Sequence, residues 1–242
     1  MSITKLPTKP TPKKPNIQDQ IILVYGDPKT GKTEFFSQFK NALFLATEDG
    51  HKHVSVLKQD INSWKDFLAV GKLLSEEKNH ANYDMLVIDT LDNAYMMCVD
   101  YICEKHGISH PSDLKMGAGW GYVNGELKRF FTKLSMLPYG LALICHKTTK
   151  DIKARTGDYT RAMPALPDTA RKFFTGFSDF IFYIKPEDVE LDGGKLGTKS
   201  FIWTRPTKFY EAGGCNTKFP EKIELNYDVF IDEYVKATKE AK

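Results

Sequence analysis

Short runs of consecutive apolar residues recur along the chain. They lie at 20–26, 42–48, 84–89, 141–146 and 179–184. Runs of this length without polar alternation are typical of strands buried on both faces, and such strands occur in parallel sheets covered by helices. The pattern therefore predicts an α/β fold with a mainly parallel sheet flanked by helices.

The segments between these runs carry apolar residues at helical spacing. Within 62–78, for example, Trp64, Phe67, Leu68 and Leu74 fall on one side of a helix. The predicted helices are 33–40, 62–78, 91–107 and 122–136.

The character of the chain changes after residue 176. The apolar segments 179–184 and 200–206 flank the glycine-containing stretch 191–197, which predicts a β-hairpin. Residues 226–241 have the pattern of a C-terminal helix.

Length and composition fit one large α/β domain or one domain with an appendage. The chain has 242 residues, is 41% hydrophobic and carries a net charge of +3. Residues 1–17 form a Pro- and Lys-rich segment with little to bury, which predicts a flexible basic tail before a domain at 18–242. No apolar stretch reaches the roughly 18 residues of a membrane span, and the N-terminus lacks the apolar segment of a secretory signal. Three of the four cysteines stand in apolar surroundings, as buried free thiols do, so we expect a cytoplasmic protein without a membrane partner.

The sequence GDPKTGKT at 26–33 matches the phosphate-binding pattern G-x-x-x-x-G-K-[ST] and stands between a predicted strand and a predicted helix. Glycines allow backbone N–H groups to surround phosphate oxygens. Lys32 is expected to neutralise the β- and γ-phosphates, and the Thr33 hydroxyl to bind Mg²⁺. The residues expected to bind the nucleotide phosphates are Gly26, Asp27, Pro28, Lys29, Thr30, Gly31, Lys32, Thr33 and Glu34.

Three further polar residues stand at the ends of predicted strands. Asp89 ends the run 84–89 and is expected to be the second magnesium ligand, whereas Asp84 precedes that run and is expected at the opposite edge of the sheet. Glu48 can orient or deprotonate an attacking water, and His146 can sense the γ-phosphate. Each of the three is also compatible with an ordinary polar residue at a strand end.

Taken in chain order, the P-loop, Glu48, Asp89 and His146 resemble the RecA-like ATPase core. The chain is most similar to the phage nucleotide-binding proteins of that group, which include phage single-strand-annealing recombinases. The resemblance covers about residues 20–210 and rests on GDPKTGKT, LFLATED, MLVIDT, LALICHK and SFIWTRPTKFYEA. RecA itself has glutamine as the sensor, so the histidine departs from that pattern. The resemblance implies an ATPase that uses ATP and Mg²⁺ and binds single-stranded DNA during phage recombination, annealing or replication, in the cytoplasm of the infected host.

The resemblance also implies two DNA-binding loops. They correspond to 106–121, where glycines surround Trp120, and to 147–173, where a basic cluster accompanies Tyr159. Mixed basic and aromatic residues suit backbone contact with base stacking, although solvated loops have the same composition. The residues expected to contact DNA are Lys147, Lys150, Lys153, Arg155, Tyr159, Arg161 and Trp120.

A homo-oligomer, either ring or filament, is implied as well, because RecA-like ATPases bind nucleotide between subunits. A basic residue from the neighbour then contacts the γ-phosphate, and Arg205 is the first candidate, ahead of Lys208. The guanidinium of Arg205 is equally compatible with a solvent-exposed hairpin position. A single-stranded-DNA-binding protein is a further expected partner.

Other functions remain open at this point. The same core is used by helicase-type ring motors, and a basic segment at 147–172 could imitate the lid of a P-loop kinase. Glu48 after the second strand argues against the kinase. A nucleotide-switched adaptor protein is the non-enzymatic alternative.

Overall fold

The computed structural model of the chain describes most of the sequence. The predicted basic tail at 1–17 lies mostly outside the described residues, as do residues 192–193 of the predicted hairpin turn. The described residues are 6, 8–10, 16–49, 53–191, 194–215 and 218–239.

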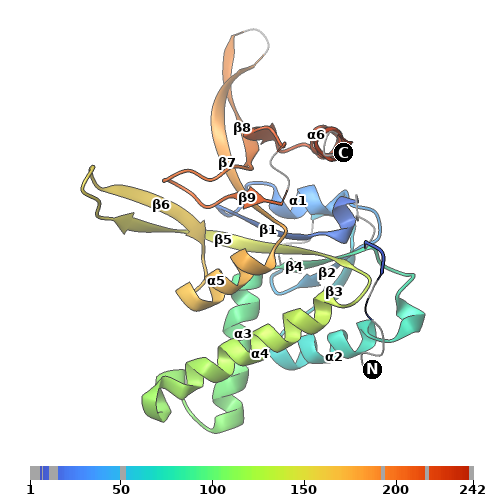
Figure 1. Cartoon of the computed structure of the whole chain (residues 1–242), viewed down its shortest axis with the longest axis vertical. Helices are drawn as coiled ribbons and strands as arrows, with labels where there is room; N and C mark the ends of the chain where they lie inside the picture. Colours follow the sequence, from blue (N-terminus) through green and yellow to red (C-terminus); the bar gives the residue numbers. More distant parts are fainter. Residues whose placement is uncertain are drawn as a thin grey trace.

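Each apolar run identified in the sequence forms a strand of a large sheet (Figure 1). Their backbones are buried on both faces, as the lack of polar alternation predicts. The strands are β1 (Ile21–Gly26), β2 (Ala42–Ala46), β3 (Leu57–Asp60), β4 (Met85–Asp89), β5 (Gly140–Ile152), β6 (Tyr159–Pro164), β7 (Phe180–Leu191), β8 (Lys195–Trp203), β9 (Gly213–Gly214) and β10 (Lys222–Glu224).

The strand order is β10-β8-β7-β1-β5-β4-β2-β3, with β6 added to β5 and β9 to β7. The six strands from β7 to β3 are parallel, and the additions at β8, β10, β6 and β9 are antiparallel. The first strand, β1, therefore has a parallel neighbour on each side, and β5 separates it from β4. The predicted α/β fold with its mainly parallel sheet and C-terminal hairpin is confirmed.

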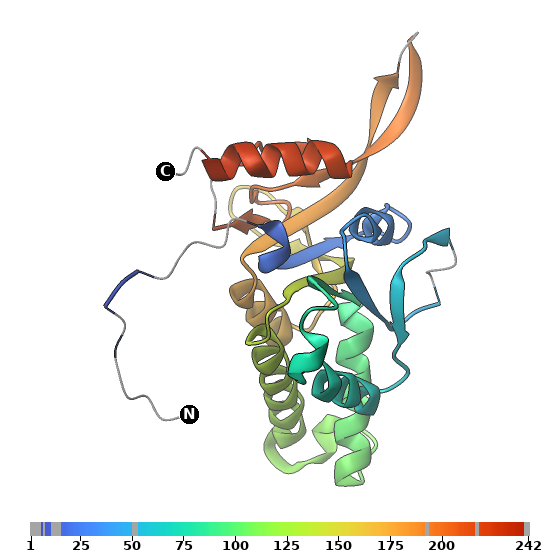
Figure 2. The same ribbon diagram turned by 90° about the vertical axis from the view of Figure 1, so that its right-hand side faces the viewer.

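Helices cover both faces of the sheet. Figure 2 shows α6 beside the sheet at one end of the molecule and the α2, α3 and α4 group at the other. The helices are α1 (Lys32–Ser37), α2 (Trp64–Leu74), α3 (Leu91–His106), α4 (Ala118–Ser135), α5 (Asp168–Phe177) and α6 (Tyr227–Lys239), with 3-10 turns η1 (Ile17–Asp19), η3 (Glu77–Asn79), η4 (Pro111–Asp113) and η5 (Lys115–Gly117).

Alternate residues of each central strand belong to two separate cores. In β1, Leu23 and Tyr25 join the core formed with α2, α3, α4 and α5, whereas Ile22 and Val24 join the core formed with α1 and α6. This alternation follows from the two-residue period of a strand. It produces three layers, helix, sheet and helix, with the carboxyl ends of the parallel strands at one edge.

The segment 147–173, expected to be a DNA-binding loop, is mostly regular structure. Strand β5 continues six residues beyond His146 and pairs with β6 as an antiparallel ribbon that projects from the sheet (Figure 1). Helix α5 follows and buries Ala170 and Phe174 in the core. The expectation of a long loop was wrong because a ribbon exposed to solvent has no apolar run to mark it.

The other expected DNA-binding loop, 106–121, is also largely ordered into η4, η5 and the start of α4. Helix α4 begins at Ala118, four residues before its predicted start, so Trp120 belongs to a helix. Gly119 is required there by close contact, because a Cβ at this position would lie 2.3 Å from the Pro111 carbonyl oxygen. Gly119, which suggested a loop, instead permits α4 to pack closely against η4.

Close backbone contact also fixes the start of β5. A Cβ on Gly140 would lie 1.8 Å from the Gln18 carbonyl oxygen, which is far inside van der Waals contact. We therefore predict that Gly140→Ala lowers the free energy of unfolding by about 1–3 kcal/mol, the usual scale of overpacking.

The matched control is Gly125→Ala within α4, where an added Cβ meets nothing within 4 Å. It is expected to stabilise the protein by up to about 1 kcal/mol because alanine favours helix. Urea unfolding of the two variants measures the difference. Equal stabilities would contradict the close contact at Gly140.

Candidate active site at the carboxyl edge of the sheet

The carboxyl ends of β1, β5, β4 and β2 converge on one cavity. The strand register pairs Gly26 with His146 and Ala46 with Asp89, so the ends of these strands lie side by side. The cavity has a volume of about 670 Å³. It is lined by Pro28, Lys29, Gly31, Lys32, Thr33, Glu34, Glu48, His53, Val54, Asp89, Thr90 and His146.

The loop between β1 and α1 needs glycine at both glycine positions of the phosphate-binding pattern, Gly26 and Gly31. A Cβ on Gly26 would lie 2.4 Å from the carbonyl oxygen of Ile184 in the adjacent strand β7. Gly31 has φ of 91°, a left-handed conformation that disfavours residues with a Cβ, and it immediately precedes α1. The loop conformation thus depends on the two glycines that the sequence pattern requires.

Lys32 lies inside this loop rather than in solvent, with only 6% of its surface exposed. Its Nζ donates to the carbonyl oxygens of Gly26 at 3.1 Å and Asp27 at 2.6 Å, and lies 3.4 Å from Thr30 Oγ1. Burial lowers the pKa of Lys32, and the carboxylates of Asp89 and Asp27 partly oppose that effect. An anion beside this amine would favour its charged form.

Thr33 and Asp89 meet directly although 56 residues separate them in the sequence. The Thr33 hydroxyl donates to Asp89 Oδ2 at 2.7 Å. Hydroxyl and carboxylate oxygens are hard ligands of the kind that Mg²⁺ prefers when it also binds phosphates. This pair of oxygens fits the expected magnesium site, and Asp84 lies at the other edge, where its side chain accepts from Asn41.

Glu48 stands two residues beyond β2 and is held by the start of α3. Its Oε1 accepts hydrogen bonds from Thr90 Oγ1 at 3.1 Å and from Asn93 Nδ2 at 2.9 Å. The Nδ1 atom of His146 lies 3.9 Å from the same oxygen. The structure therefore brings Glu48, Asp89 and His146 together beside Lys32.

His146 is positioned by Asp92, a residue that the sequence analysis did not identify. Asp92 Oδ1 accepts from the His146 backbone N–H at 3.1 Å, and Asp92 Oδ2 lies 2.8 Å from His146 Nδ1. An ionised carboxylate can only accept, so the proton of a neutral ring is on Nδ1 and Nε2 is left for a ligand. Asp92 and Asn93 share the first turn of α3 and orient His146 and Glu48, respectively. Polar residues are common in first turns, so the sequence carried no distinctive signal for them.

The residues expected to contact DNA divide into three places. Lys147 forms an ion pair with Asp27 of the P-loop at 2.6 Å, so it lies beside the phosphate-binding loop. Trp120 packs on His110 and donates from Nε1 to Ser112 Oγ at 3.2 Å, far along the chain from the ribbon residues. Trp120 lies in helix α4 and not in a loop, which corrects the expected loop position.

The remaining expected DNA contacts belong to the ribbon of β5 and β6. Lys150 pairs across the ribbon with Arg161, while Lys153 and Arg155 are exposed in its turn. Tyr159 begins β6 and is half-buried. The structure therefore places these five expected DNA contacts together on the projecting ribbon.

Arg205 follows β8 and is exposed, and its guanidinium donates to the carbonyl oxygen of Phe219 at 2.9 Å. This contact holds the chain after β8 against the segment that leads to β10. The predicted role of Arg205 in a neighbouring subunit stays a prediction.

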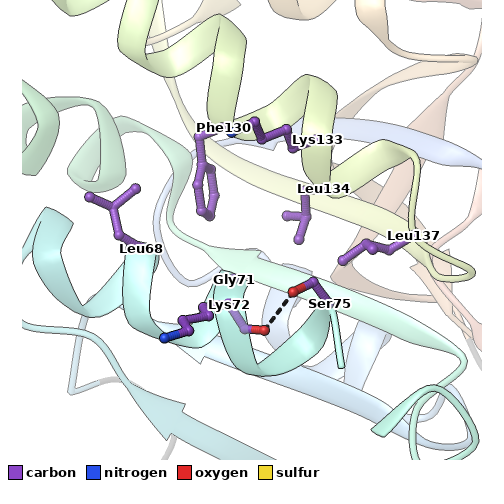
Figure 3. A pocket seen from close by; sticks show the side chains of 8 residues that line it. All are labelled: Leu68, Gly71, Lys72, Ser75, Phe130, Lys133, Leu134 and Leu137. Atoms are coloured by element: carbon purple, nitrogen blue, oxygen red, sulfur yellow. Dashed lines mark hydrogen bonds between the residues drawn. The ribbon is translucent and has the colours of Figure 1, made fainter. Parts of the chain in front are cut away.

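A second, smaller cavity of about 280 Å³ lies between α2 and α4 (Figure 3). The side chains of Leu68 and Phe130 point into it, and the Ser75 hydroxyl donates to the Lys72 carbonyl oxygen at 2.6 Å. It has no carboxylate or histidine in its lining. The cavity between α2 and α4 therefore lacks the acid, base and metal-ligand candidates that line the cavity at the P-loop.

Sheet order, phosphate-binding loop and strand-end carboxylates define a P-loop nucleoside-triphosphatase with a RecA-like α/β core. The family model described as an AAA domain matches residues 18–214, and the chain belongs to this family. The domain is a nucleotide-binding ATPase domain. Among the described residues, no helix has the length and apolar character to cross a bilayer.

The chain is also similar to individual proteins. The SPbeta prophage-derived uncharacterized protein YorG of Bacillus subtilis strain 168 is 25% identical over 236 residues, covering 93% of this chain and 69% of its own length. The flagellar accessory protein FlaH of Methanocaldococcus jannaschii has a crystal structure that matches with a TM-score of 0.40 and 10% identity, over 86% of this chain and 84% of that one.

The contacts of Glu48 generate a prediction about turnover. We expect Glu48→Gln to keep nucleotide affinity but to slow ATP hydrolysis by about 10²-fold, because the amide cannot accept a proton from water. Single-turnover hydrolysis and equilibrium binding of a non-hydrolysable ATP analogue measure the two effects separately.

Asn93→Ala is the matched control, because it removes a hydrogen bond to Glu48 while leaving the carboxylate in place. A smaller loss is expected than for Glu48→Gln. Normal turnover by Glu48→Gln would show that another group activates the water.

Proposed function

We propose that the protein is a Mg²⁺-dependent ATPase of RecA-like type that binds single-stranded DNA and assists phage recombination, strand annealing or replication. The observation that carries the ATPase is the convergence of Lys32, Thr33, Asp89 and Glu48 on one cavity. Charge, metal-binding oxygens and a base-like carboxylate are the three requirements of phosphoryl transfer to water.

Each residue has a separate task in this proposal. Lys32 binds the β- and γ-phosphates, and Thr33 with Asp89 holds the magnesium ion. Magnesium supplies positive charge that neutralises the phosphate oxygens. Glu48 orients a water molecule and accepts its proton, while Thr90 and Asn93 fix the carboxylate. His146 Nε2 contacts the γ-phosphate.

DNA binding is supported by the position of the ribbon. Strand β5 runs without interruption from His146 beside the P-loop into the basic ribbon. A change at the γ-phosphate can therefore be transmitted along one backbone to Lys150, Lys153 and Arg155. Similarity to a prophage-derived protein supports a phage origin and, with it, activity in the host cytoplasm.

An oligomer, ring or filament, is part of the same proposal. The nucleotide is bound between subunits, and Arg205 of one subunit completes the site of the next. A single-stranded-DNA-binding protein is a further partner in this proposal.

The first test measures ATP hydrolysis with and without single-stranded DNA. Wild-type protein is expected to hydrolyse ATP faster with DNA, and Lys32→Ala to lose hydrolysis and most nucleotide binding because the phosphate charge loses its counter-charge. Hydrolysis by Lys32→Ala at the wild-type rate would contradict the P-loop assignment.

The same assay distinguishes the alternatives. Phosphate transfer to a small molecule would indicate a kinase, and DNA unwinding coupled to hydrolysis would indicate a helicase-type motor. Nucleotide binding without turnover would indicate a switched adaptor.

The second test concerns the ribbon. Replacement of Lys150, Lys153 and Arg155 by alanine should weaken binding of an oligo-dT strand and reduce the slope of log affinity against log salt by about 2, since three phosphate contacts are removed. Thermal stability should be nearly unchanged, because the sole ion pair of Lys150 among the described contacts is long, at 3.9 Å, and exposed.

Lys236→Ala together with Lys65→Ala is a matched control, because both lysines are exposed in helices away from the ribbon. These changes should leave the slope unaltered. A folded triple variant with full DNA affinity would assign DNA binding to another surface, with the N-terminal basic segment as the next candidate.

The third test concerns assembly. Arg205→Ala and Lys32→Ala are each expected to be inactive, and mixing them should restore some hydrolysis because each supplies the group that the other lacks. A cation supplied in trans can raise the rate by about 10³. Hydrolysis per subunit should also increase with protein concentration.

Arg205 also bonds to the Phe219 carbonyl, so thermal melting must show that Arg205→Ala remains folded. Lys208→Ala is the control for the alternative cation. A folded Arg205→Ala protein without rescue, together with a monomeric mass in ATP, would contradict the shared site.

A further inference from the structure

The segment after β8 crosses the base of the ribbon and is fixed to it. The Ala162 backbone N–H donates to the Phe209 carbonyl oxygen at 2.7 Å, and the Glu211 N–H lies 3.3 Å from the Ala162 carbonyl oxygen. The Tyr25 hydroxyl, inside the core, donates to the Glu211 carbonyl oxygen at 2.7 Å. Residues 209–211 are therefore tied to both the ribbon and the sheet.

This fixed segment presents an aromatic ring to solvent. The side chain of Phe209 is 51% exposed, although its backbone is bonded to the ribbon. Its ring meets the Tyr159 ring edge to face, with centroids 6.0 Å apart and planes at 85°. Lys208 Nζ lies 5.0 Å from the Phe209 ring centroid and 5.7 Å from that of Tyr159. We refer to Tyr159, Lys208 and Phe209 as the aromatic platform.

Cations lie on the same face of the ribbon as the platform. Tyr159 and Arg161 are two residues apart in β6 and so point to one side, and Lys150 lies directly across from Arg161. Opposite partners in an antiparallel pair share a face. The face thus carries aromatic rings at one end and two cations beside them.

Acidic neighbours reduce but do not cancel this charge. Lys150 lies 3.9 Å from Asp168, and Arg161 lies 3.9 Å from Glu211. Neither separation is a hydrogen bond, whereas Glu211 contacts Arg171 much more closely. The two ribbon cations keep donors for an incoming anion.

We propose that the aromatic platform stacks a base of single-stranded DNA, while Lys150 and Arg161 bind the phosphates next to that base. This inference rests on the proposed DNA-binding function and assigns it two residues that the sequence analysis did not connect with DNA, Lys208 and Phe209. The Phe209 ring is exposed, and its backbone is hydrogen-bonded to the ribbon. A base that stacks on this ring therefore loses little affinity to the conformational entropy of ordering the protein. Bases stacked within a duplex offer no free face, so the platform selects single strands.

The test uses Phe209→Ala and a 20-nucleotide oligo-dT strand. Loss of one stacked base should weaken binding about 5- to 100-fold. The slope of log affinity against log salt should not change, because no phosphate contact is lost. This combination separates stacking from the charge effect expected of the ribbon cations.

Phe209→Trp provides a second, spectroscopic measurement. It should keep wild-type affinity, and its added tryptophan fluorescence should be quenched by the DNA when compared with wild-type protein. Leu196→Ala is the control, since Leu196 is an exposed apolar residue, 85% accessible, on β8. It should leave DNA affinity unchanged.

The outcomes distinguish this inference from the proposed function. Wild-type protein that fails to bind the strand would contradict the proposed function itself. If wild-type protein binds but Phe209→Ala binds equally well, or if Phe209→Trp is not quenched, the platform is overturned alone. A change in oligomeric mass with unchanged DNA affinity would assign Phe209 to a contact between copies and would also overturn it.

Discussion

The parallel pairing of β1, β5, β4 and β2 is the constraint on which the candidate active site depends. Each strand contributes one chemically active end, and parallel alignment places all four ends at the same edge. Gly26 allows β7 to approach β1 closely enough to complete this arrangement. The hydrogen bond between Thr33 and Asp89 follows from it, because the P-loop and the end of β4 are brought to one point.

A second consequence of this arrangement concerns communication. Strand β5 lies between β1 and β4, and its own end carries His146. The strand then leaves the sheet as the first half of the ribbon. Asp92 binds both the backbone and the ring of His146, so the start of α3 fixes the residue at which strand and ribbon meet. The candidate active site and the ribbon are thus connected through one short, well-bonded segment.

Much of the fold was predictable because buried parallel strands leave continuous apolar runs. The P-loop was predictable because its local geometry requires particular residue types. Gly26 and Gly31 stand where a Cβ would clash or strain the backbone, and Lys32 supplies the positive charge. The ribbon was not, because both of its faces meet solvent and its sequence resembles a basic loop. Asp92 and Asn93 were missed because they act on His146 and Glu48, which are 54 and 45 residues away in the sequence. Trp120 was misplaced because glycine serves tight packing as well as flexibility.

Magnesium dependence tests the central account most directly, because it depends on Thr33 and Asp89 acting as a pair. Calorimetric titration with a non-hydrolysable ATP analogue, in Mg²⁺ and in excess EDTA, should show tighter binding with the metal. Thr33→Val, which replaces only the hydroxyl, should abolish that gain while keeping the metal-free affinity. Equal affinity of wild-type protein with and without Mg²⁺, or a full magnesium effect in Thr33→Val, would contradict the account.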